Sequence, residues 1–447
     1  MTELLPAATA SEARKVAAEI LHRLRDEELV AEAARSAAAT VGRSLWEPGA
    51  ALYGGAAGSA VAFAHAARAF PDSGWWTQAH RWLKVAAAST RERPLQRPGL
   101  SLGTTGIALA VAECDEDGRY ARTLRGLDSR LAQQLDGFGA AADRALTVHD
   151  YDVISGLAGI LGYASRRPAT VHVVIERLVA RCATGHGPLT TSRWTPWRIA
   201  PENYGRDGER ELYPHGYVDL GLAHGLPGPL AALSRAWLAG HRAPGMRGAI
   251  RGLADQLVAA SWWGEHGRTW SRVMPFDASG EIAPRLGQPS EPAYCYGAPG
   301  ITSALLDAAE ALGDASVRAV AVEGFEAALR LLEARPRTLG PGLCHGVGGV
   351  LLICRAFAVR TGSAAARAAL ECLVERLLGG CDPGHPLIVR DYKPQVTGEP
   401  GSPLAASRGG AWIDQPGLLE GAAGVALALL SVTEPVPPRW ADALMAG

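Results

Sequence analysis

The chain has 447 residues, and its hydrophobic content of 48% predicts a folded globular protein with a substantial core. Its 44 basic residues nearly balance its 45 acidic residues, which excludes the electrostatic footprint of a nucleic-acid partner or an anionic membrane surface. The N-terminal segment has charges throughout and no signal-like apolar region, and no stretch approaches the length of a membrane span. We therefore expect a cytoplasmic protein with no stable membrane insertion.

Charged amphipathic segments alternate along the chain with nearly uncharged ones. In chain order, segments 11–36, 119–138 and 316–336 carry apolar residues at helical spacing, which predicts helices with one solvated face. The uncharged segments begin with one frame, Gly-x-x-Gly followed by small and apolar residues, and predict helices packed on all sides. The frame occurs seven times, and its first glycines are Gly55, Gly103, Gly156, Gly225, Gly297, Gly346 and Gly421.

This alternation predicts an all-α fold of seven inner and seven outer helices. The most economical arrangement is a closed α/α toroid, with residues 1–447 as a single domain. An open solenoid is the alternative, but it would need polar caps at both ends, and the first and last frames are as apolar as the others. In a toroid the segments before the inner helices lie at one end, so side chains at matching offsets should converge on the axis.

The residues at matching offsets include an unusual set of cysteines and histidines. Two residues before the first glycine, the frames carry Tyr53, Ser101, Ile154, Ala223, Cys295, Cys344 and Leu419. One residue before it, they carry Gly54, Leu102, Ser155, His224, Tyr296, His345 and Glu420. Two cysteines thus share an offset in consecutive frames, and two histidines share the next offset.

Cys295, Cys344 and His345 can form a set of two sulfurs and one nitrogen. Three such ligands to a tetrahedral Zn²⁺ leave a fourth position for water or substrate, as in catalytic zinc sites. The alternative is two small buried thiols and a hydrogen-bonded core histidine. The chain has seven cysteines in all, an odd number that does not fit a small secreted disulfide framework, and the other five lie outside the frames.

His224 is the best candidate for a general acid or base, because an imidazole titrates near neutrality. Asp152, four residues before Gly156, could orient His224 or accept a proton. The alternative for His224 is a histidine whose hydrogen bonds are satisfied at a helix start, and the alternative for Asp152 is a carboxylate that caps a helix N-terminus. Zinc would deprotonate a substrate thiol, and a nearby imidazolium could protonate the enolate formed when that thiolate adds to an electron-poor alkene. These groups are the minimal set for conjugate addition.

The motifs YCYGAPG, LCHGVGG, GLAHGLPG and DVISGLAG resemble those of LanC-type lanthipeptide cyclases, and the resemblance covers essentially the whole chain. It implies an α/α toroid that holds one Zn²⁺ through Cys295, Cys344 and His345. The implied activity closes the thioether rings of lanthipeptide antibiotics, by adding precursor-peptide cysteines to dehydroalanine or dehydrobutyrine. By matched motif, His224 and Asp152 resemble the acid/base pair of the family, and Tyr296 is expected to line the pocket.

The chain departs from the family pattern at two positions. Tyr294 stands where the family usually has Trp, and Glu291 stands where many members have an Arg that helps with substrate or enolate. Arg285 is a speculative substitute for that Arg. Segment 185–217 resembles the small β-containing extension of the family and could touch the precursor, although a plain loop insertion fits equally. The segment 396–411 is expected to be a mobile loop.

The expected partners are a dehydrated, leader-bearing precursor peptide and a separate dehydratase, because the toroid uses the whole chain. One alternative is a protein of similar type that adds a small thiol such as glutathione to dehydroamino acids. Others are a zinc-dependent prenyltransferase subunit and a non-catalytic scaffold that binds peptides or a dehydratase.

Overall fold

The computed structural model describes residues 4–46, 49–138, 146–183, 194–204, 208–283, 289–335, 339–396, 407–433 and 438–447. The chain forms two compact units. The first unit comprises Met1–Leu131, Arg335–Lys393 and Gly410–Gly447, and the second comprises Ala132–Ala334 and Pro394–Gly409. Each unit is described separately below, and a single domain over 1–447 stays a prediction.

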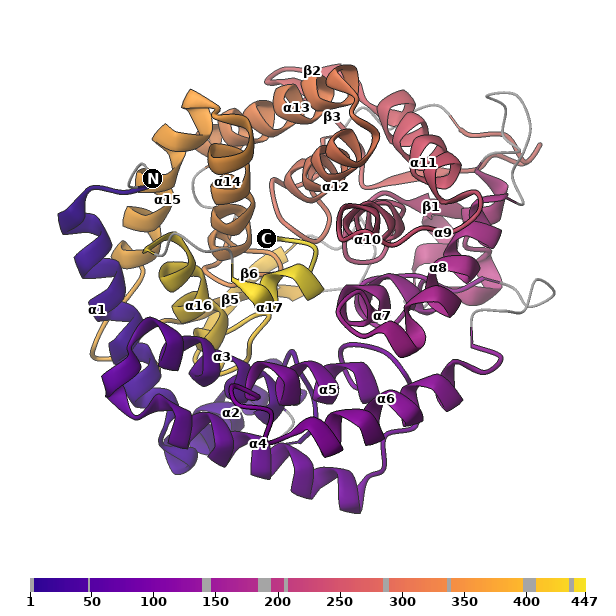
Figure 1. The fold of residues 1–447 in the computed structure, drawn as a ribbon. Coiled ribbons are helices and arrows are strands. Elements are labelled where there is room, and N and C mark those ends of the chain that lie inside the picture. Colours follow the sequence, from indigo (N-terminus) through magenta and orange to yellow (C-terminus); the bar gives the residue numbers. More distant parts are fainter. Residues whose placement is uncertain are drawn as a thin grey trace. The chain divides into compact units, whose positions relative to one another are not determined.

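Four inner helices form a row in the first unit (Figure 1). In the order in which they pack side by side, they are α14 (Val347–Thr361), α16 (Ala422–Thr433), α3 (Ala56–Ala69) and α5 (Thr104–Glu113). Each begins directly after the first glycine of a frame, and nearly all of its residues are buried. The uncharged segments therefore become the core of this unit, as the sequence predicts.

Amphipathic helices cover this row. They are α1 (Ala7–Leu24), α2 (Glu27–Val41), α4 (Trp75–Glu92), the start of α6 (Ala121–Leu135), α15 (Ala364–Gly379) and the short α17 (Arg439–Ala443). α4 packs on α3, α15 packs on α14, and α1 packs on α16, so the start of the chain covers the last inner helix. The segment 11–36 is two helices, because Asp26 accepts hydrogen bonds from the amides of Glu28 and Leu29 and starts α2.

The second unit has a row of three inner helices, α7 (Leu157–Ala164), α10 (Pro227–Leu238) and α12 (Ala298–Leu312). Its outer helices are α8 (Pro168–Ala183), α11 (Met246–Ala260) and α13 (Ala315–Ala334), each packed on the inner helix that precedes it. The seven frames thus start seven buried helices in the part of the chain that the structure describes, as the repeat predicts.

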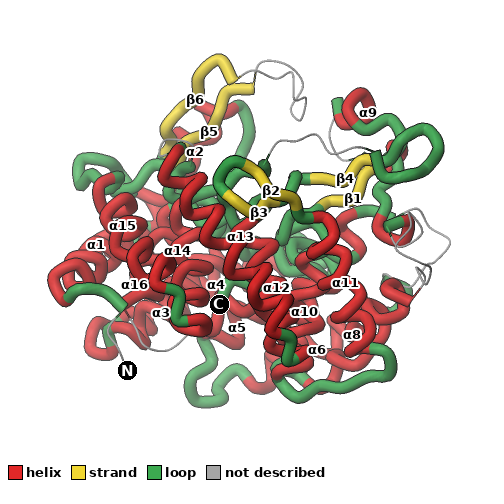
Figure 2. Tube along the Cα trace, turned by 90° about the horizontal axis from the view of Figure 1, so that it is seen from above, coloured by secondary structure: helices red, strands yellow, loops and turns green. Residues whose placement is uncertain are grey.

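Strands are few, and Figure 2 shows those of the second unit on one side of its helices. β1 (Tyr217–Asp219) pairs antiparallel with β4 (Val273–Pro275), and β2 (Trp262–Gly264) pairs with β3 (Gly267–Thr269). Of the segment 185–217, residues 184–193 and 205–207 are outside the described residues. The rest contains 3₁₀ turns at Thr195–Trp197 and Pro201–Asn203, helix α9 (Glu209–Leu212) and the first residue of β1.

A third strand pair is β5 (Asp391–Val396) with β6 (Ser407–Ile413). The expectation of a loop over 396–411 is therefore wrong at both ends, where the chain is extended and paired, and its middle, 397–406, lies outside the described residues.

Backbone hydrogen bonds tie neighbouring frames together at the offset two residues before the first glycine. In the first unit, the carbonyls of Ser101, Tyr53 and Leu419 accept from Leu52 (2.9 Å), Leu418 (2.8 Å) and Leu343 (2.9 Å), respectively. In the second unit, the carbonyls of Ala223 and Cys295 accept from Val153 (3.0 Å) and Ala223 (3.3 Å). Within each unit, matching offsets therefore lie side by side.

Glycines permit this close approach. A Cβ atom added at Gly300, the second glycine of its frame, would lie 2.7 Å from Leu222 Cβ of the preceding frame. A Cβ atom at Gly221 would lie 2.8 Å from Tyr296 Cδ1 and 2.5 Å from the carbonyl oxygen of Cys295. Real Cβ contacts are not this short, so side chains at these two positions would push the frames apart.

Candidate active site

Asp152 is fully buried in the second unit and uses its two carboxylate oxygens for different purposes. Oδ1 accepts hydrogen bonds from the amides of Ser155 (2.6 Å) and Gly156 (2.8 Å), at the start of α7. Oδ2 lies 2.6 Å from Nδ1 of His224. Asp152 therefore both caps a helix and contacts His224, as the two sequence-based interpretations proposed separately. The capping hydrogen bonds fix the carboxylate that faces the imidazole.

His224 precedes α10 and is held between Asp152 and an aromatic ring. Its side chain is 25% exposed, whereas that of Asp152 is 0% exposed, so the pair is reachable from solvent only through the imidazole. The ring of Tyr296 lies beside it, with centroids 5.9 Å apart and planes inclined by 31°. This arrangement presents an imidazole, backed by a buried carboxylate, beside a phenol ring.

Arg272 completes this part of the site, and sequence reasoning missed it. Its guanidinium carbon lies 4.1 Å from the centroid of the Tyr296 ring, within cation–π distance. Arg272 lies outside the frames, directly before β4, and the pairing of β4 with β1 brings it there. A cation beside an imidazole can stabilise negative charge that develops on a bound carbonyl oxygen.

Glu291, at the expected arginine position, supplies no cation. Glu291 is solvent-exposed in the second unit, and Arg285 lies outside the described residues. Tyr294, which replaces the usual Trp, is 2% exposed, and burial raises its pKa far above the ordinary value. Tyr294 is therefore a neutral core residue.

Cys295 lies in the second unit, two residues before Gly297, the N-cap of α12. It is 1% exposed, and its carbonyl accepts the amide hydrogen of Ala223, the residue before His224. The backbone therefore joins the frame that carries this thiol to the frame that carries the imidazole.

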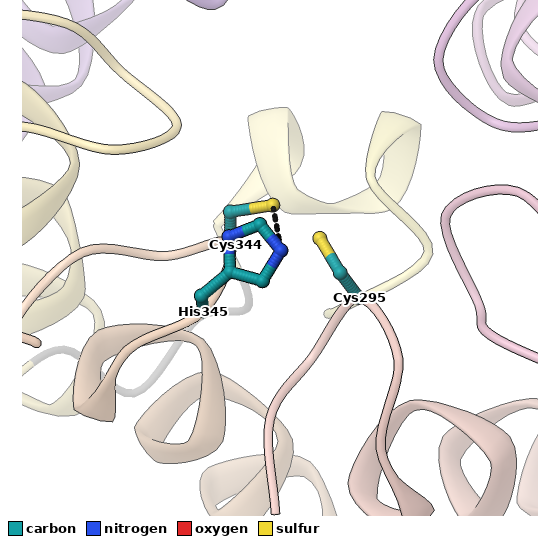
Figure 3. Close-up of side chains that lie close together, drawn as sticks. All are labelled: Cys295, Cys344 and His345. Atoms are coloured by element: carbon teal, nitrogen blue, oxygen red, sulfur yellow. Dashed lines mark hydrogen bonds between the residues drawn. The ribbon is translucent and has the colours of Figure 1, made fainter. Parts of the chain in front are cut away.

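Cys344 and His345 lie in the first unit, just before Gly346, the N-cap of α14 (Figure 3). The Cys344 Sγ atom is 3.8 Å from Nε2 of His345, and Cys344 is 6% exposed whereas the His345 side chain is 53% exposed. The amides of Leu343 and Cys344 both donate to the carbonyl of Leu419 at 2.9 Å. A thiol and an imidazole nitrogen thus share one side of the loop.

The other nitrogen of His345 faces a carboxylate. Nδ1 lies 3.6 Å from Oε1 of Glu420, which stands at the same offset in the next frame of this unit. Lys393 Nζ lies 3.1 Å from Oε2 of Glu420 and 2.7 Å from Asp391. Burial raises the pKa of Glu420, but pairing with His345 and Lys393 lowers it more, to about 2. In metal sites, a histidine commonly contacts a carboxylate through one ring nitrogen and binds the metal through the other.

The remaining cysteines carry no part of this arrangement. Cys114, Cys182, Cys354, Cys372 and Cys381 are free thiols outside the frames. Burial raises the pKa of Cys114 and of Cys182 to about 12, which makes both poor nucleophiles.

No helix among the residues that the structure describes is long and apolar enough to span a membrane.

Comparison with known proteins agrees with these features. Residues 48–445 match the family model of the lanthionine synthetase C-like proteins. The nisin biosynthesis protein NisC of Lactococcus lactis subsp. lactis is 26% identical over 268 residues, which are 57% of this chain and 61% of the relative. The match thus spans under two thirds of that relative. A solved structure of a nisin cyclase matches with a TM-score of 0.72 and 19% identity, over 94% of this chain and 96% of the other. This likeness shows the fold, the α/α toroid that the frames predict.

Proposed function

Because the chain belongs to the lanthionine synthetase C-like family, we propose that it closes thioether rings in a dehydrated precursor peptide. A cysteine thiol of the peptide adds to a dehydroalanine or dehydrobutyrine and gives a lanthionine or methyllanthionine. The dehydroamino acids come from removal of water from serine and threonine, a different reaction that we assign to a separate dehydratase.

We further propose that Cys295, Cys344 and His345 hold one Zn²⁺. Two thiolates and one imidazole are a ligand set that suits zinc. The contact of Glu420 with Nδ1 of His345 supports this ligand set, because it directs Nε2 toward the thiol side of the loop. When bound, zinc would lower the pKa of a substrate thiol so that the thiolate forms near neutrality.

His224 is the proton donor of the proposed reaction. A bond forms between the substrate sulfur and the β-carbon of the dehydroamino acid, and the alkene electron pair moves to give an enolate. His224, as imidazolium, gives its proton to the α-carbon, and the proton released by the thiol restores it. Asp152, 2.6 Å from Nδ1, orients the ring and favours its charged form. Product and substrate therefore have the same mass.

Arg272 is the cation of the proposed site. Its position over Tyr296, whose ring lies beside His224, suits a guanidinium that receives the enolate oxygen. We assign it the task for which many family members use an arginine at the position of Glu291. Tyr296 then holds both the imidazole and the guanidinium in place.

The pairing of His224 with a buried, doubly anchored Asp152 is the observation that carries the proposal. The test is to incubate the purified protein with a dehydrated cysteine-containing peptide and to label free thiols with iodoacetamide. Loss of labelling with unchanged peptide mass is expected, and it should disappear in His224→Ala. Labelling that stays complete with the wild-type protein would contradict the proposal. Addition of glutathione to the same peptide, in place of ring closure, would favour the small-thiol alternative.

A further inference from the structure

The first unit contains a cavity of about 550 Å³ that the proposed chemistry does not use. It lies between the loop before α14, the end of α15 and the strands β5 and β6. Its lining residues are Leu339, Gly340, Pro341, Val347, Arg376, Leu377, Gly380, Arg390, Tyr392 and Trp412. This volume falls in the range of sites that bind small molecules or a few peptide side chains.

An aromatic pair forms one wall. The rings of Tyr392 in β5 and Trp412 in β6 have centroids 5.3 Å apart and planes inclined by 56°. Trp412 is 52% exposed, although a tryptophan is usually well buried in a folded protein. Leu339, Val347 and Leu377 supply aliphatic surface to the same cavity. Rigid aromatic side chains that stand open to solvent at a cavity are typical of peptide-binding sites.

Two arginines give the cavity its charge. Arg390 is fixed by an ion pair of 3.2 Å between its Nε and Oδ2 of Asp414. Among the described residues, no carboxylate forms an ion pair with Arg376, at the end of α15. Arg376 is half-buried, and this burial lowers the pKa of its guanidinium. A cation that is partly desolvated in this way favours an incoming carboxylate.

The cavity adjoins the residues proposed as metal ligands in the same unit. Val347, the first residue of α14, lies two positions after His345, and its amide donates to the carbonyl of Gly340 at 2.8 Å. Tyr392 is the neighbour of Lys393, which pairs with Glu420, the partner of His345. A peptide bound in the cavity is therefore held close to this part of the site.

From these contacts we propose that the cavity binds an acidic segment of the substrate peptide that lies outside the ring being closed. The segment places an aromatic or branched aliphatic side chain against Tyr392 and Trp412 and a carboxylate on Arg376. This inference rests on the proposed function, because it takes the occupant to be the peptide on which the protein acts. Binding of such a segment can nevertheless be measured separately from ring closure.

The test measures binding with full-length protein and a fluorescein-labelled probe, Gly-Glu-Phe-Glu-Leu-Gly, which has neither cysteine nor dehydroamino acid. Fluorescence anisotropy should show saturable binding, weakened about tenfold or more in Arg376→Glu and in Trp412→Ala. The matched control is Arg367→Glu, an exposed position on α15 outside the cavity, which should bind as wild type. The reversed probe Gly-Lys-Phe-Lys-Leu-Gly should bind Arg376→Glu better than wild type.

Equal affinity of wild type, Arg376→Glu and Trp412→Ala for the acidic probe would overturn the inference, as would loss of binding in Arg367→Glu to the same degree. If the probe gave either of these results but the wild-type protein still closed rings, the proposed function would stand and only the cavity inference would fail. Conversely, probe binding that depends on Arg376 in a protein that closes no ring would support the cavity and contradict the proposed function.

Discussion

Replacing Asp152 by Asn tests the acid/base pair with little change of shape. Asn keeps an oxygen that can cap α7 through Ser155 and Gly156, but it places an uncharged amide 2.6 Å from Nδ1 of His224. Hydrogen bonds to charged groups contribute about 1.5 to 3 kcal/mol. If that stabilisation of the imidazolium is lost, ring closure should slow about 10- to 150-fold.

The assay is the rate at which free thiols disappear from a dehydrated peptide at saturating concentration. Asp150→Asn is the control, because Asp150 is a neighbouring buried carboxylate whose Oδ2 accepts hydrogen bonds from the amide and the hydroxyl of Thr147. Asp152→Asn and Asp150→Asn should have similar thermal stability, and only the former should lose rate. A wild-type rate in folded Asp152→Asn would refute the reasoning.

Three further predictions follow from the contacts described above. Arg272→Met should lower the rate of ring closure by about tenfold or more with unchanged metal content, and Arg272→Lys should keep part of the wild-type rate. Equal rates for Arg272→Met and wild type would show that Arg272 takes no part in the reaction. Gly221→Ala should displace the Tyr296 ring, lower the rate and perturb the tyrosine's environment in NMR spectra, whereas an unchanged spectrum would contradict the close contact. Burial and, to a smaller extent, the charge of Arg68 lower the pKa of His65 to about 4. Between pH 6.5 and 4 the unfolded chain therefore binds more protons than the folded protein. The free energy of unfolding should fall by about 3 kcal/mol as the pH is lowered through that range. In His65→Leu, urea denaturation at the two pH values should show a smaller difference than in wild type, and an identical difference would contradict this cause.

The repeat frame let the sequence predict much of the site. The sequence points to Cys295, Cys344, His345 and His224 only through their shared offsets before an inner helix. Within each unit, the backbone places these offsets side by side. The capping role of Asp152 was also readable, since a carboxylate ahead of a helix start is common. The contact of Glu420 with His345 could have been found from the same register, because Glu420 occupies the offset of His345 in the next frame.

Arg272 could not be found in this way. It belongs to no frame, and its position depends on the pairing of β1 with β4, two three-residue strands separated by more than fifty positions in the sequence. Register between such short strands is set by the surrounding tertiary structure, which local patterns do not report. The same reason applies to the cavity beside β5 and β6, whose wall combines residues from a loop, two helices and a strand pair.

The most direct test of the central claim is metal analysis of the purified protein beside its Cys295→Ala and Cys344→Ala variants. The control is Cys372→Ala, which removes an exposed free thiol outside the frames. We expect about one zinc per chain in wild type and in the control, and little in the other two variants, whose helical content should persist. Properly folded wild type without zinc, or full zinc in both frame variants, would contradict the account.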